Sequence, residues 1–385
     1  MMVLEQVATL QKFANIAPEQ VERDLATYLR PGGADPKPQH VAATLQHVAP
    51  TVATRLQDLV KKTSELFEQR AKEVEVLVAG LAGGVSVALL GPPGTAKSAL
   101  VRRVALLCGL SGDDGRYFEY LMTTHTMPEE IFGGPDLNQL VKGKVVRVTT
   151  GKLPQAEVAF LDEVFRGGSH ILNTLLTIIN EKRFDDGSGA RHVPLLGLVG
   201  ASNTAPVDPD LDAFFDRFPI RVWLRSVLEP RGKFDGGDQQ AAARLAKFSL
   251  RGDADRLAQA WDPKTAAVAI KNDQVACTND FRFARAYLLQ RLQTQAEKSE
   301  RLAQFERLFR SLRERCRLSD RSFGQLWIFA AALDFVRGKD PSRAYPASDG
   351  HVEVFRFAGR SAQDVLFLND RVEQQTRALQ HTGAA

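Results

Sequence analysis

The chain has 385 residues, of which 44% are hydrophobic and 25% charged, and its formal net charge is +4. This length exceeds one average domain, and the composition is that of an ordinary globular protein with enough apolar residues for a sizeable core. The small excess of positive charge does not by itself predict a nucleic-acid partner, because such proteins cluster basic residues on one face.

The cysteines and the N-terminal segment predict a protein of the cytoplasm. Cys108, Cys277 and Cys316 lie far apart in the sequence, which argues against a disulfide framework or a zinc site and fits a reducing compartment. The first twenty residues lack the basic start, apolar run and cleavage site of a secretion signal. No stretch approaches the roughly 18 uncharged apolar residues of a membrane span, so we expect none.

The first part of the chain is predicted to be helical. Residues 1–30 carry apolar side chains at three-to-four spacing, and the stretch 31–38, rich in proline and glycine, predicts a linker. A second helical stretch covers residues 41–79. We expect it to break at Pro50, with Thr51 capping the helix that follows.

The middle of the chain alternates short apolar runs with helical patterns. The runs at 85–90, 158–161 and 196–201 are bounded by glycine, proline or acidic residues, which is typical of buried parallel strands. Helical patterns lie between them, including residues 97–107 and 169–179. This alternation predicts an α/β fold with a doubly wound parallel sheet.

After Pro230 the sequence shows the periodicity of helices instead of the short apolar runs of strands. Residues 299–318 and the stretch after Ser319 each place apolar side chains along one face, and residues 361–379 predict a last helix. The predicted domains are an N-terminal helical extension (1–50), an α/β core (51–228), a helical lid domain (229–340) and a C-terminal tail or helix (341–385).

A phosphate-binding loop is predicted where the first apolar run ends. Strand, glycine-rich turn and helix follow one another there, as this motif requires. Its residues are Gly91, Pro92, Pro93, Gly94, Thr95, Ala96, Lys97, Ser98 and Ala99. Glycines let backbone amides close around phosphate oxygens, Lys97 would reach the outer phosphates, and the Ser98 hydroxyl could bind magnesium. Ala96 replaces the usual glycine, which we expect to be tolerated if its dihedral angles are helical.

Polar residues follow the next two apolar runs. A neighbouring strand would bring Asp162 to the magnesium shell, while Glu163 could orient and polarise the attacking water. An Asp-Glu pair after a strand is common, but its position about 65 residues after a phosphate loop makes it specific. Asn203 would lie beside Glu163 and hold the water or sense the γ-phosphate. A turn-forming asparagine is the alternative.

Arginines are candidates for stabilising charge in the transition state. Arg217 precedes a strand predicted at 220–224 and could act on the ATP of a neighbouring subunit. The alternative is an intramolecular salt bridge to Asp212 or Asp216, and Arg221 is a weaker rival for the same role. Arg321, near the start of a helix, could reach the γ-phosphate from the lid.

Together these residues resemble an AAA+ ATPase, and more narrowly the MoxR family, especially its RavA branch. The resemblance is close over residues 55–225 and loose over 226–340. Its most specific segments are 91–98 with alanine before the lysine, 118–123, 128–133 and 172–181. The resemblance implies that Lys97 and Ser98 belong to Walker A, Asp162 and Glu163 to Walker B, and that Asn203 is sensor 1, Arg217 the arginine finger and Arg321 sensor 2.

Two insertions also fit this family. Residues 142–153 predict a hairpin inserted in the second helix, and residues 183–193 predict a hairpin before sensor 1. In similar proteins such hairpins point toward a central pore or a partner surface. Ordinary surface hairpins are the alternative.

The resemblance implies an enzyme that hydrolyses ATP with Mg²⁺ in a homo-oligomeric ring, most simply a hexamer, because the arginine finger acts on a neighbouring subunit. Similar proteins remodel or assemble protein clients, typically with a partner that contains a von Willebrand factor A domain. One alternative is a nucleic-acid motor similar to minichromosome maintenance helicases, but residues 1–50 do not resemble their zinc-bearing N-terminal region. The basic residues of 299–318 alternate with glutamates, which is more typical of a solvated face. A scaffold that binds nucleotide without hydrolysis is the second alternative.

Overall fold

A computed structural model describes residues 38–67, 69–110, 116–226, 275–276, 278–295, 300–339 and 350–382. The chain divides into two compact units. The sheet unit comprises Leu59–Leu77 and Ser86–Ala276, and the helical unit comprises Met1–Asp58, Val78–Val85 and Cys277–Ala385. The helix predicted at 1–30 and the linker up to residue 37 lie outside the described residues. The domain boundaries proposed after residues 50, 228 and 340 remain predictions.

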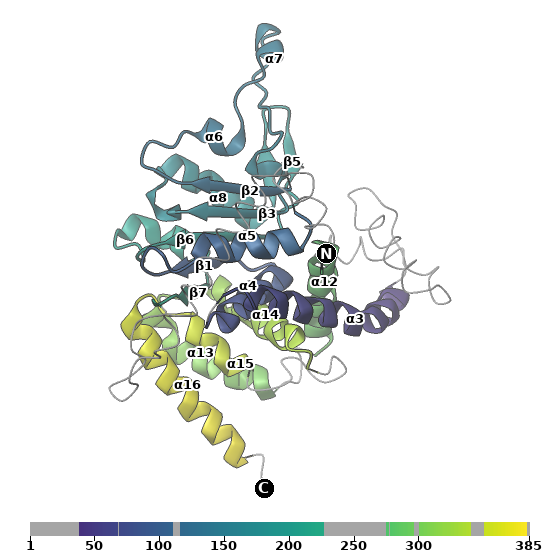
Figure 1. Cartoon of the computed structure of the whole chain (residues 1–385), viewed down its shortest axis with the longest axis vertical. Coiled ribbons are helices and arrows are strands. Elements are labelled where there is room, and N and C mark those ends of the chain that lie inside the picture. The colour runs from purple at the N-terminus through teal and green to yellow at the C-terminus, as the bar shows by residue number, and fades with distance from the viewer. Residues whose placement is uncertain are drawn as a thin grey trace. The chain divides into compact units, whose positions relative to one another are not determined.

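The sheet unit is built on five strands (Figure 1). They are β1 (Val87–Leu90), β2 (Tyr117–Leu121), β3 (Val158–Asp162), β6 (Gly197–Ser202) and β7 (Ile220–Trp223). Their order is β2-β3-β6-β1-β7, and every neighbouring pair is parallel. The predicted parallel sheet is therefore confirmed, and its buried strands coincide with the apolar runs. Strand β2 was not expected, because as an edge strand it is only half-buried and its sequence is not continuously apolar.

Helices pack around this sheet and complete its core. Helix α5 (Lys97–Leu107) has its predicted bounds, and α8 (Ser169–Glu181) extends two residues past its prediction. Buried side chains at three-to-four spacing explain why α8 forms, namely Ile171, Leu172, Leu175, Ile178 and Ile179. The shorter elements of the unit are α6 (Pro128–Phe132), η3 (Leu153–Gln155), η4 (Val164–Arg166), η5 (Pro209–Leu211) and α9 (Asp212–Phe215).

The first insertion is a projecting stalk, residues 133–152, that carries the short helix α7 (Leu137–Val141) (Figure 1). The hairpin predicted within 142–153 is wrong in its pairing. Instead, the Asp136 N–H donates to the Val146 carbonyl and the Val148 N–H donates to the Gly134 carbonyl, both at 2.8 Å. The Asp136 carboxylate accepts hydrogen bonds from the first backbone amides of α7, so a capped helix occupies the tip where a turn was expected.

The second insertion is a hairpin, as predicted. Strands β4 (Arg183–Asp185) and β5 (Ala190–His192) pair in antiparallel register. The turn between them contains Gly187, whose φ is +90°. This positive φ explains the glycine, because other residues rarely adopt it.

The helical unit confirms the helices predicted after residue 299. Its elements are α12 (Thr278–Gln295), α13 (Glu300–Cys316), α14 (Asp320–Val336), α15 (Gly350–Glu353), η7 (Val354–Phe357) and α16 (Ala362–Thr382). Phe305 on α13 joins them in a core, with its ring centroid 5.0 Å from those of Phe323, Trp327 and Phe355. Among the described residues, no helix combines the length and the apolarity needed to cross a bilayer.

The break predicted at Pro50 is wrong, because α3 (Pro38–Ser64) runs through it. A proline inside a helix removes one backbone hydrogen bond and crowds the preceding turn. Here buried side chains on both sides of Pro50 keep the helix continuous, namely Val48, Ala49, Val52, Ala53 and Leu56. Thr51 therefore caps no helix. The chain next leaves helical geometry after Ser64, before α4 (Ala71–Gly83).

Candidate active site

The predicted phosphate loop connects β1 to α5 at the carboxyl edge of the sheet. Gly91 is required there, because its φ is +146° and a Cβ atom would lie 2.1 Å from the Leu224 carbonyl oxygen. That carbonyl is held in place because the Leu224 N–H donates to Leu90 O at 2.7 Å. Gly94 also has a positive φ, +78°, and an added Cβ would meet no atom within 4 Å. The loop is thus anchored at Gly91 and open beside Gly94.

Ala96 does not meet the condition under which alanine was expected to be tolerated, namely right-handed helical dihedral angles. Its φ of 68° and ψ of 23° are left-handed, and it forms the N-terminal cap residue of α5. A left-handed conformation costs an L-residue roughly 1–2 kcal/mol. The loop is therefore locally strained at the position where glycine is usual, as is common at functional sites.

Lys97 lies under the loop with its ammonium group bound to oxygens of the chain. Its Nζ donates to Gly91 O at 2.6 Å, to Pro92 O at 3.0 Å and to Asn203 Oδ1 at 3.2 Å. Burial lowers the pKa of Lys97, and the negative charges of Asp162 and Glu163 partly oppose this shift. These contacts preorganise Lys97 at the mouth of the loop.

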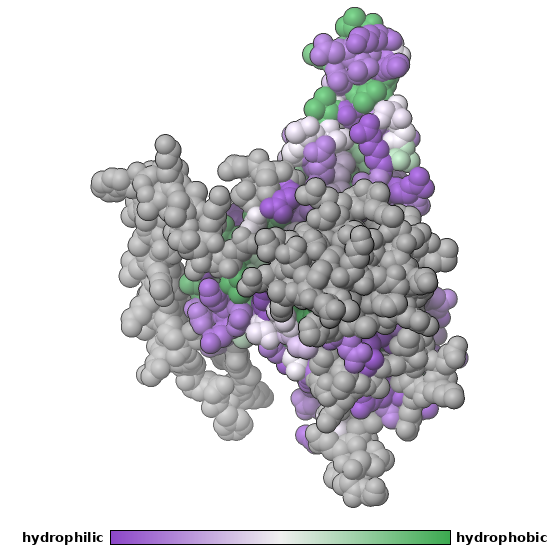
Figure 2. Space-filling model, turned by 90° about the vertical axis from the view of Figure 1, so that its right-hand side faces the viewer, coloured by the Kyte–Doolittle hydropathy of each residue, from purple (hydrophilic) through white to green (hydrophobic). Residues whose placement is uncertain are grey.

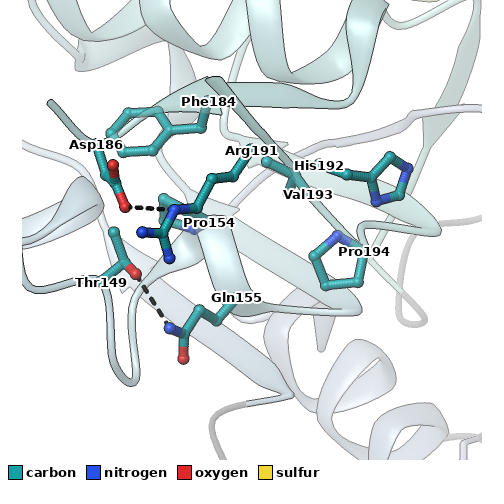
Figure 3. Close-up of a pocket in the computed structure, with 9 residues that line it drawn as sticks. All are labelled: Thr149, Pro154, Gln155, Phe184, Asp186, Arg191, His192, Val193 and Pro194. Carbon is teal, nitrogen blue, oxygen red and sulfur yellow. Dashed lines mark hydrogen bonds and ion pairs between the residues drawn. The ribbon is translucent and has the colours of Figure 1, made fainter. Parts of the chain in front are cut away.

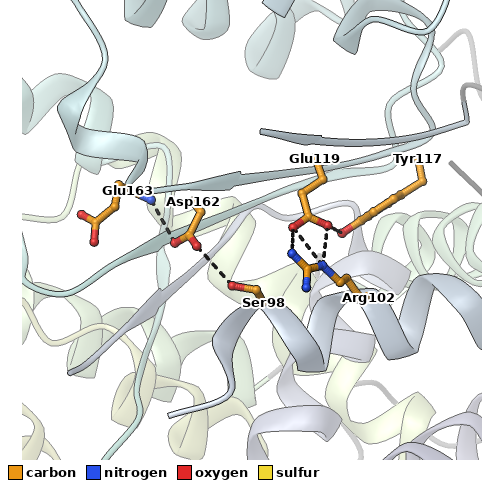
Figure 4. A network of polar contacts seen from close by, with 6 residues as sticks. All are labelled: Ser98, Arg102, Tyr117, Glu119, Asp162 and Glu163. Atoms are coloured by element: carbon orange, nitrogen blue, oxygen red, sulfur yellow. Dashed lines mark hydrogen bonds and ion pairs between the residues drawn. The ribbon is translucent and has the colours of Figure 1, made fainter. Parts of the chain in front are cut away.

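Ser98 and Asp162 meet as predicted. The Ser98 hydroxyl donates to Asp162 Oδ2 at 3.2 Å, and Asp162 Oδ1 accepts the Glu163 N–H at 3.0 Å (Figure 4). Ser98 lies in the first turn of α5, and Asp162 is the last residue of β3. A hydroxyl and a carboxylate are hard oxygen ligands of the kind that Mg²⁺ takes, so this pair fits the magnesium site that the sequence predicted.

Asn203 and Glu163 are also in contact. Asn203 Nδ2 donates to Glu163 Oε1 at 2.6 Å. Strand β6 brings them together, because it pairs with β3 and ends one residue before Asn203. The predicted proximity is confirmed, while the catalytic roles of both side chains remain predictions.

Two arrangements near these residues were missed by the sequence analysis. Arg166 Nε lies 3.3 Å from Glu163 Oε2. On the far side of Ser98, Arg102 Nε lies 2.9 and 3.0 Å from the two oxygens of Glu119, and the Tyr117 hydroxyl donates to Glu119 Oε2 at 2.9 Å (Figure 4). Burial and the Glu119 charge raise the pKa of Tyr117, which keeps its hydroxyl protonated as a donor. This cluster ties α5 to β2, one turn after Ser98.

The arginines predicted near the site differ in their surroundings. Arg217 Nη1 lies 3.0 Å from Asp216 Oδ2, so the intramolecular salt bridge given as its alternative is present. Its action on a neighbouring subunit remains a prediction. Arg221 is fully buried, donates from Nε to Phe218 O at 2.9 Å and lies 4.2 Å from the Phe215 ring centroid. Arg221 is therefore a core residue that cannot extend to another molecule, and its prediction as a rival of Arg217 is wrong.

Arg321 lies on α14, in the helical unit, and is exposed. Its proposed reach to the γ-phosphate remains a prediction.

The two insertions pack against each other at some distance along the chain from the loop. The Arg147 N–H donates to Asp186 O at 2.7 Å, and a Cβ added at Gly187 would lie 1.8 Å from the Val145 carbonyl oxygen. A cavity of about 230 Å³ lies at their junction (Figure 3). It is lined in part by Asp186, which is buried and paired with Arg191 at 2.9 Å. Stalk and hairpin thus form one packed element.

Residues 54–232 match the model of a protein family described as the MoxR domain in MoxR-vWA-beta-propeller ternary systems. This segment contains the loop, Asp162, Glu163, Asn203 and Arg217. The core of the chain belongs to the MoxR family of AAA+ ATPases. The match does not test the narrower resemblance of this MoxR core to the RavA branch, which remains a prediction.

Three proteins of known sequence are similar to part of this chain. Two uncharacterized proteins of Methanocaldococcus jannaschii are 39% identical over 174 and 173 residues, each covering 45% of this chain. A structural protein of the Acidianus two-tailed virus is 30% identical over 195 residues, or 50% of this chain. The matched segments span only 44%, 45% and 31% of those proteins.

The fold also matches a solved structure. A protein of Cytophaga hutchinsonii, described as a candidate ATPase, superimposes with a TM-score of 0.56 over 82% of this chain and 89% of that chain. At 16% identity this likeness concerns the fold alone. It confirms the predicted AAA+ architecture of an α/β core with a helical C-terminal region.

Proposed function

We propose that this MoxR-type protein binds ATP at residues 91–99 and hydrolyses it with Mg²⁺. The observation that supports the proposal is the convergence of five side chains at the carboxyl ends of β1, β3 and β6. They are Lys97, Ser98, Asp162, Glu163 and Asn203, linked by the contacts at 2.6–3.2 Å described above. Phosphoryl transfer needs positioning and charge stabilisation more than covalent chemistry, and this set supplies both.

Each side chain has a defined task in this proposal. Ser98 and Asp162 would hold Mg²⁺, which neutralises phosphate charge when bound. Lys97 exchanges its loop carbonyls for phosphate oxygens. Glu163 accepts a hydrogen bond from the attacking water, and Asn203 holds the water or senses the γ-phosphate.

We further propose that the active site is completed in a homo-oligomeric ring, most simply a hexamer. Arg217 would leave Asp216 and stabilise transition-state charge on the neighbouring subunit's ATP, and Arg321 would act from the helical unit. An arginine suits this role because its planar guanidinium binds phosphate in two places and is always charged.

We propose that the ring remodels or assembles a protein client with a partner that contains a von Willebrand factor A domain. The description of the matched family supports this partner, since it names MoxR-vWA-beta-propeller systems. The stalk suits a protein contact, because it exposes large apolar side chains, namely Leu137, Val141 and Val145. Figure 2 shows hydrophobic surface at this projecting end.

A nucleic-acid motor is less well supported. Three arginines of α13 are paired with carboxylates: Arg310 with Glu306, Arg313 with Asp320 and Arg315 with Asp364, at 2.6–3.0 Å. Such pairs indicate a solvated, charge-balanced face. ATPase activity that rises with DNA and falls steeply with salt would instead favour the motor.

The direct test measures ATP turnover by the purified chain and by Lys97→Ala. We expect turnover to fall at least about a hundredfold, because the charge that holds the outer phosphates is lost. Unchanged turnover in Lys97→Ala would overturn the proposal. For the ring, loss of turnover in Arg217→Ala, restored by mixing with Glu163→Gln subunits, would show that neighbours share the site.

A further inference from the structure

Arg166 lies beside the water-activating carboxylate without belonging to any predicted motif. It ends η4, the short 3-10 helix that begins immediately after Glu163. Its N–H donates to the Glu163 carbonyl at 2.9 Å, which closes one turn. Glu163 itself has a φ of 50°, in the left-handed region. The strained residue and the tight turn together place the two side chains next to each other.

The Glu163 carboxylate is consequently held at both oxygens. Asn203 donates to Oε1 at 2.6 Å, and Arg166 Nε lies 3.3 Å from Oε2. A carboxylate that activates water must offer one oxygen to a proton of that water. Each oxygen keeps a lone pair for that water, but the two donors draw charge from the carboxylate and restrict its rotation toward the water.

The two contacts differ in how nucleotide would affect them. Asn203 Oδ1 also accepts a hydrogen bond from Lys97 Nζ at 3.2 Å. Movement of Lys97 to a phosphate would break this bond and free the Asn203 side chain to move. Arg166 has no such link to Lys97. Its side chain is 62% exposed, so its contact with Glu163 persists until another group competes for the guanidinium.

We propose that Arg166 is a positioning residue that restrains the Glu163 carboxylate and so limits the rate of ATP hydrolysis in the isolated chain. The inference rests on the proposed ATPase function. A neighbouring acidic group that binds the exposed guanidinium would release Glu163 and speed turnover.

The size of the effect follows from the exposure of the pair. Solvent weakens an ion pair at such a site, and exposed pairs change an equilibrium by about fivefold at most. We therefore expect Arg166→Ala to raise kcat about two- to fivefold. KM and the Kd for a non-hydrolysable ATP analogue should stay within about twofold, because Arg166 contacts none of the residues proposed to bind phosphate.

The experiment compares wild type, Arg166→Ala and Arg166→Lys in steady-state turnover and in equilibrium binding of the analogue. The lysine variant keeps a cation that can pair with Glu163, so its kcat should return toward wild type. Arg310→Ala is the matched control, because Arg310 is 76% exposed and pairs with Glu306 on its own helix. It removes the same charge and should leave kcat unchanged.

An equal or lower kcat in Arg166→Ala, with binding preserved, overturns the inference. A raised kcat that Arg166→Lys fails to reverse overturns it as well. If Arg166→Ala unfolds at a lower temperature than wild type, Arg166→Gln is measured in the same assay, because it removes the charge but keeps a longer polar side chain. Its kcat then decides the question. The proposed function fails separately, if wild-type turnover does not depend on Lys97.

Discussion

The phosphate loop and the joint between the two insertions each contain a glycine with positive φ, yet they differ in what surrounds it. At the loop, Gly91 lies against the Leu224 carbonyl just after β7, and Lys97 beneath the loop donates to Gly91 O and Asn203 Oδ1. At the joint, Gly187 of the hairpin lies against the Val145 carbonyl of the stalk, and the stalk beyond it exposes apolar side chains. One glycine supports the sheet, whereas the other supports only the joint between two projections.

The difference indicates a division of labour. Residues that carry chemistry lie at the ends of buried parallel strands, where packing fixes them to within a few tenths of an ångström. Residues proposed to meet a partner lie on segments with few buried contacts, which can change without disturbing the sheet. Substitutions in the two regions should therefore separate catalysis from assembly.

The largest expected effect is on catalysis alone. Glu163→Gln removes the carboxylate charge that polarises the attacking water, while the glutamine amide has nearly the same shape. We therefore expect ATP turnover to fall about 10²- to 10⁴-fold. ATP should still bind, and the bound nucleotide should stabilise the ring. Turnover and nucleotide retention after gel filtration measure both properties. Retained turnover would favour the scaffold alternative, in which nucleotide only sets assembly.

Gly91→Ala and Gly187→Ala form a matched pair that tests the comparison directly. Both add a Cβ within 2.1 Å of a carbonyl oxygen. In Gly91→Ala strands β1 and β7 must separate, so we expect a loss of about 3 kcal/mol in unfolding free energy and weak ATP binding. In Gly187→Ala the strain is confined to the joint, so nucleotide affinity should change less than about twofold while proteolysis of residues 133–152 accelerates. Equal losses of nucleotide affinity would contradict the division.

A smaller effect is expected from the buried carboxylate at the joint. Burial raises the pKa of Asp186, but hydrogen bonds from Ser188 and the charge of Arg191 outweigh it, so the pKa lies below its ordinary value of 3.8. A lowered pKa in the folded state means that the charged form stabilises the joint. This stabilisation is present above pH 3.8 and is lost as the pH falls through the lowered pKa.

Asp186→Asn should reproduce the acid state at neutral pH. We expect a local loss of about 1–2 kcal/mol, because the Arg191 contact loses its charge. Hydrogen exchange of the amides in 183–192, measured against those of β1, would detect it. Equal protection in the variant and wild type at neutral pH would argue that Asp186 does not hold the joint.

The sequence predicted the parts of the site that depend on local order. Lys97 and Ser98 begin the helix after β1, and Asp162 ends β3, so all three lie at the carboxyl edge of one parallel sheet. Strand β3 is not the neighbour of β1 that was expected, because β6 lies between them. Arg166 was missed because its contact depends on the positive φ of Glu163 and the tight turn after it, which no spacing rule indicates. Glu119 was missed as well, because the half-buried edge strand β2 is not a continuous apolar run.

Long-range packing explains the errors in the fold. Pro50 favours a break locally, but buried neighbours on α3 outweigh that preference. The stalk was predicted as a simple hairpin because its valines lie around glycines. The pairing instead forms between residues on either side of α7, since Asp136 caps a helix within the insertion. Both outcomes depend on residues outside the short segment on which each prediction was based.

The smallest expected effect concerns Ala96, which lacks the helical dihedral angles that were the condition for tolerating alanine. Glycine adopts the observed left-handed conformation without the roughly 1–2 kcal/mol that alanine loses there. It also loses about 0.4–1 kcal/mol more conformational entropy on folding. Ala96→Gly should therefore raise the unfolding free energy by at most about 1.6 kcal/mol, and Ala96→Val should lower it, because a β-branched residue tolerates this conformation least. Chemical denaturation of both variants measures the difference. If Ala96→Gly instead destabilises the chain by more than 1 kcal/mol, the loop is not strained at this residue, and alanine is there for its contacts.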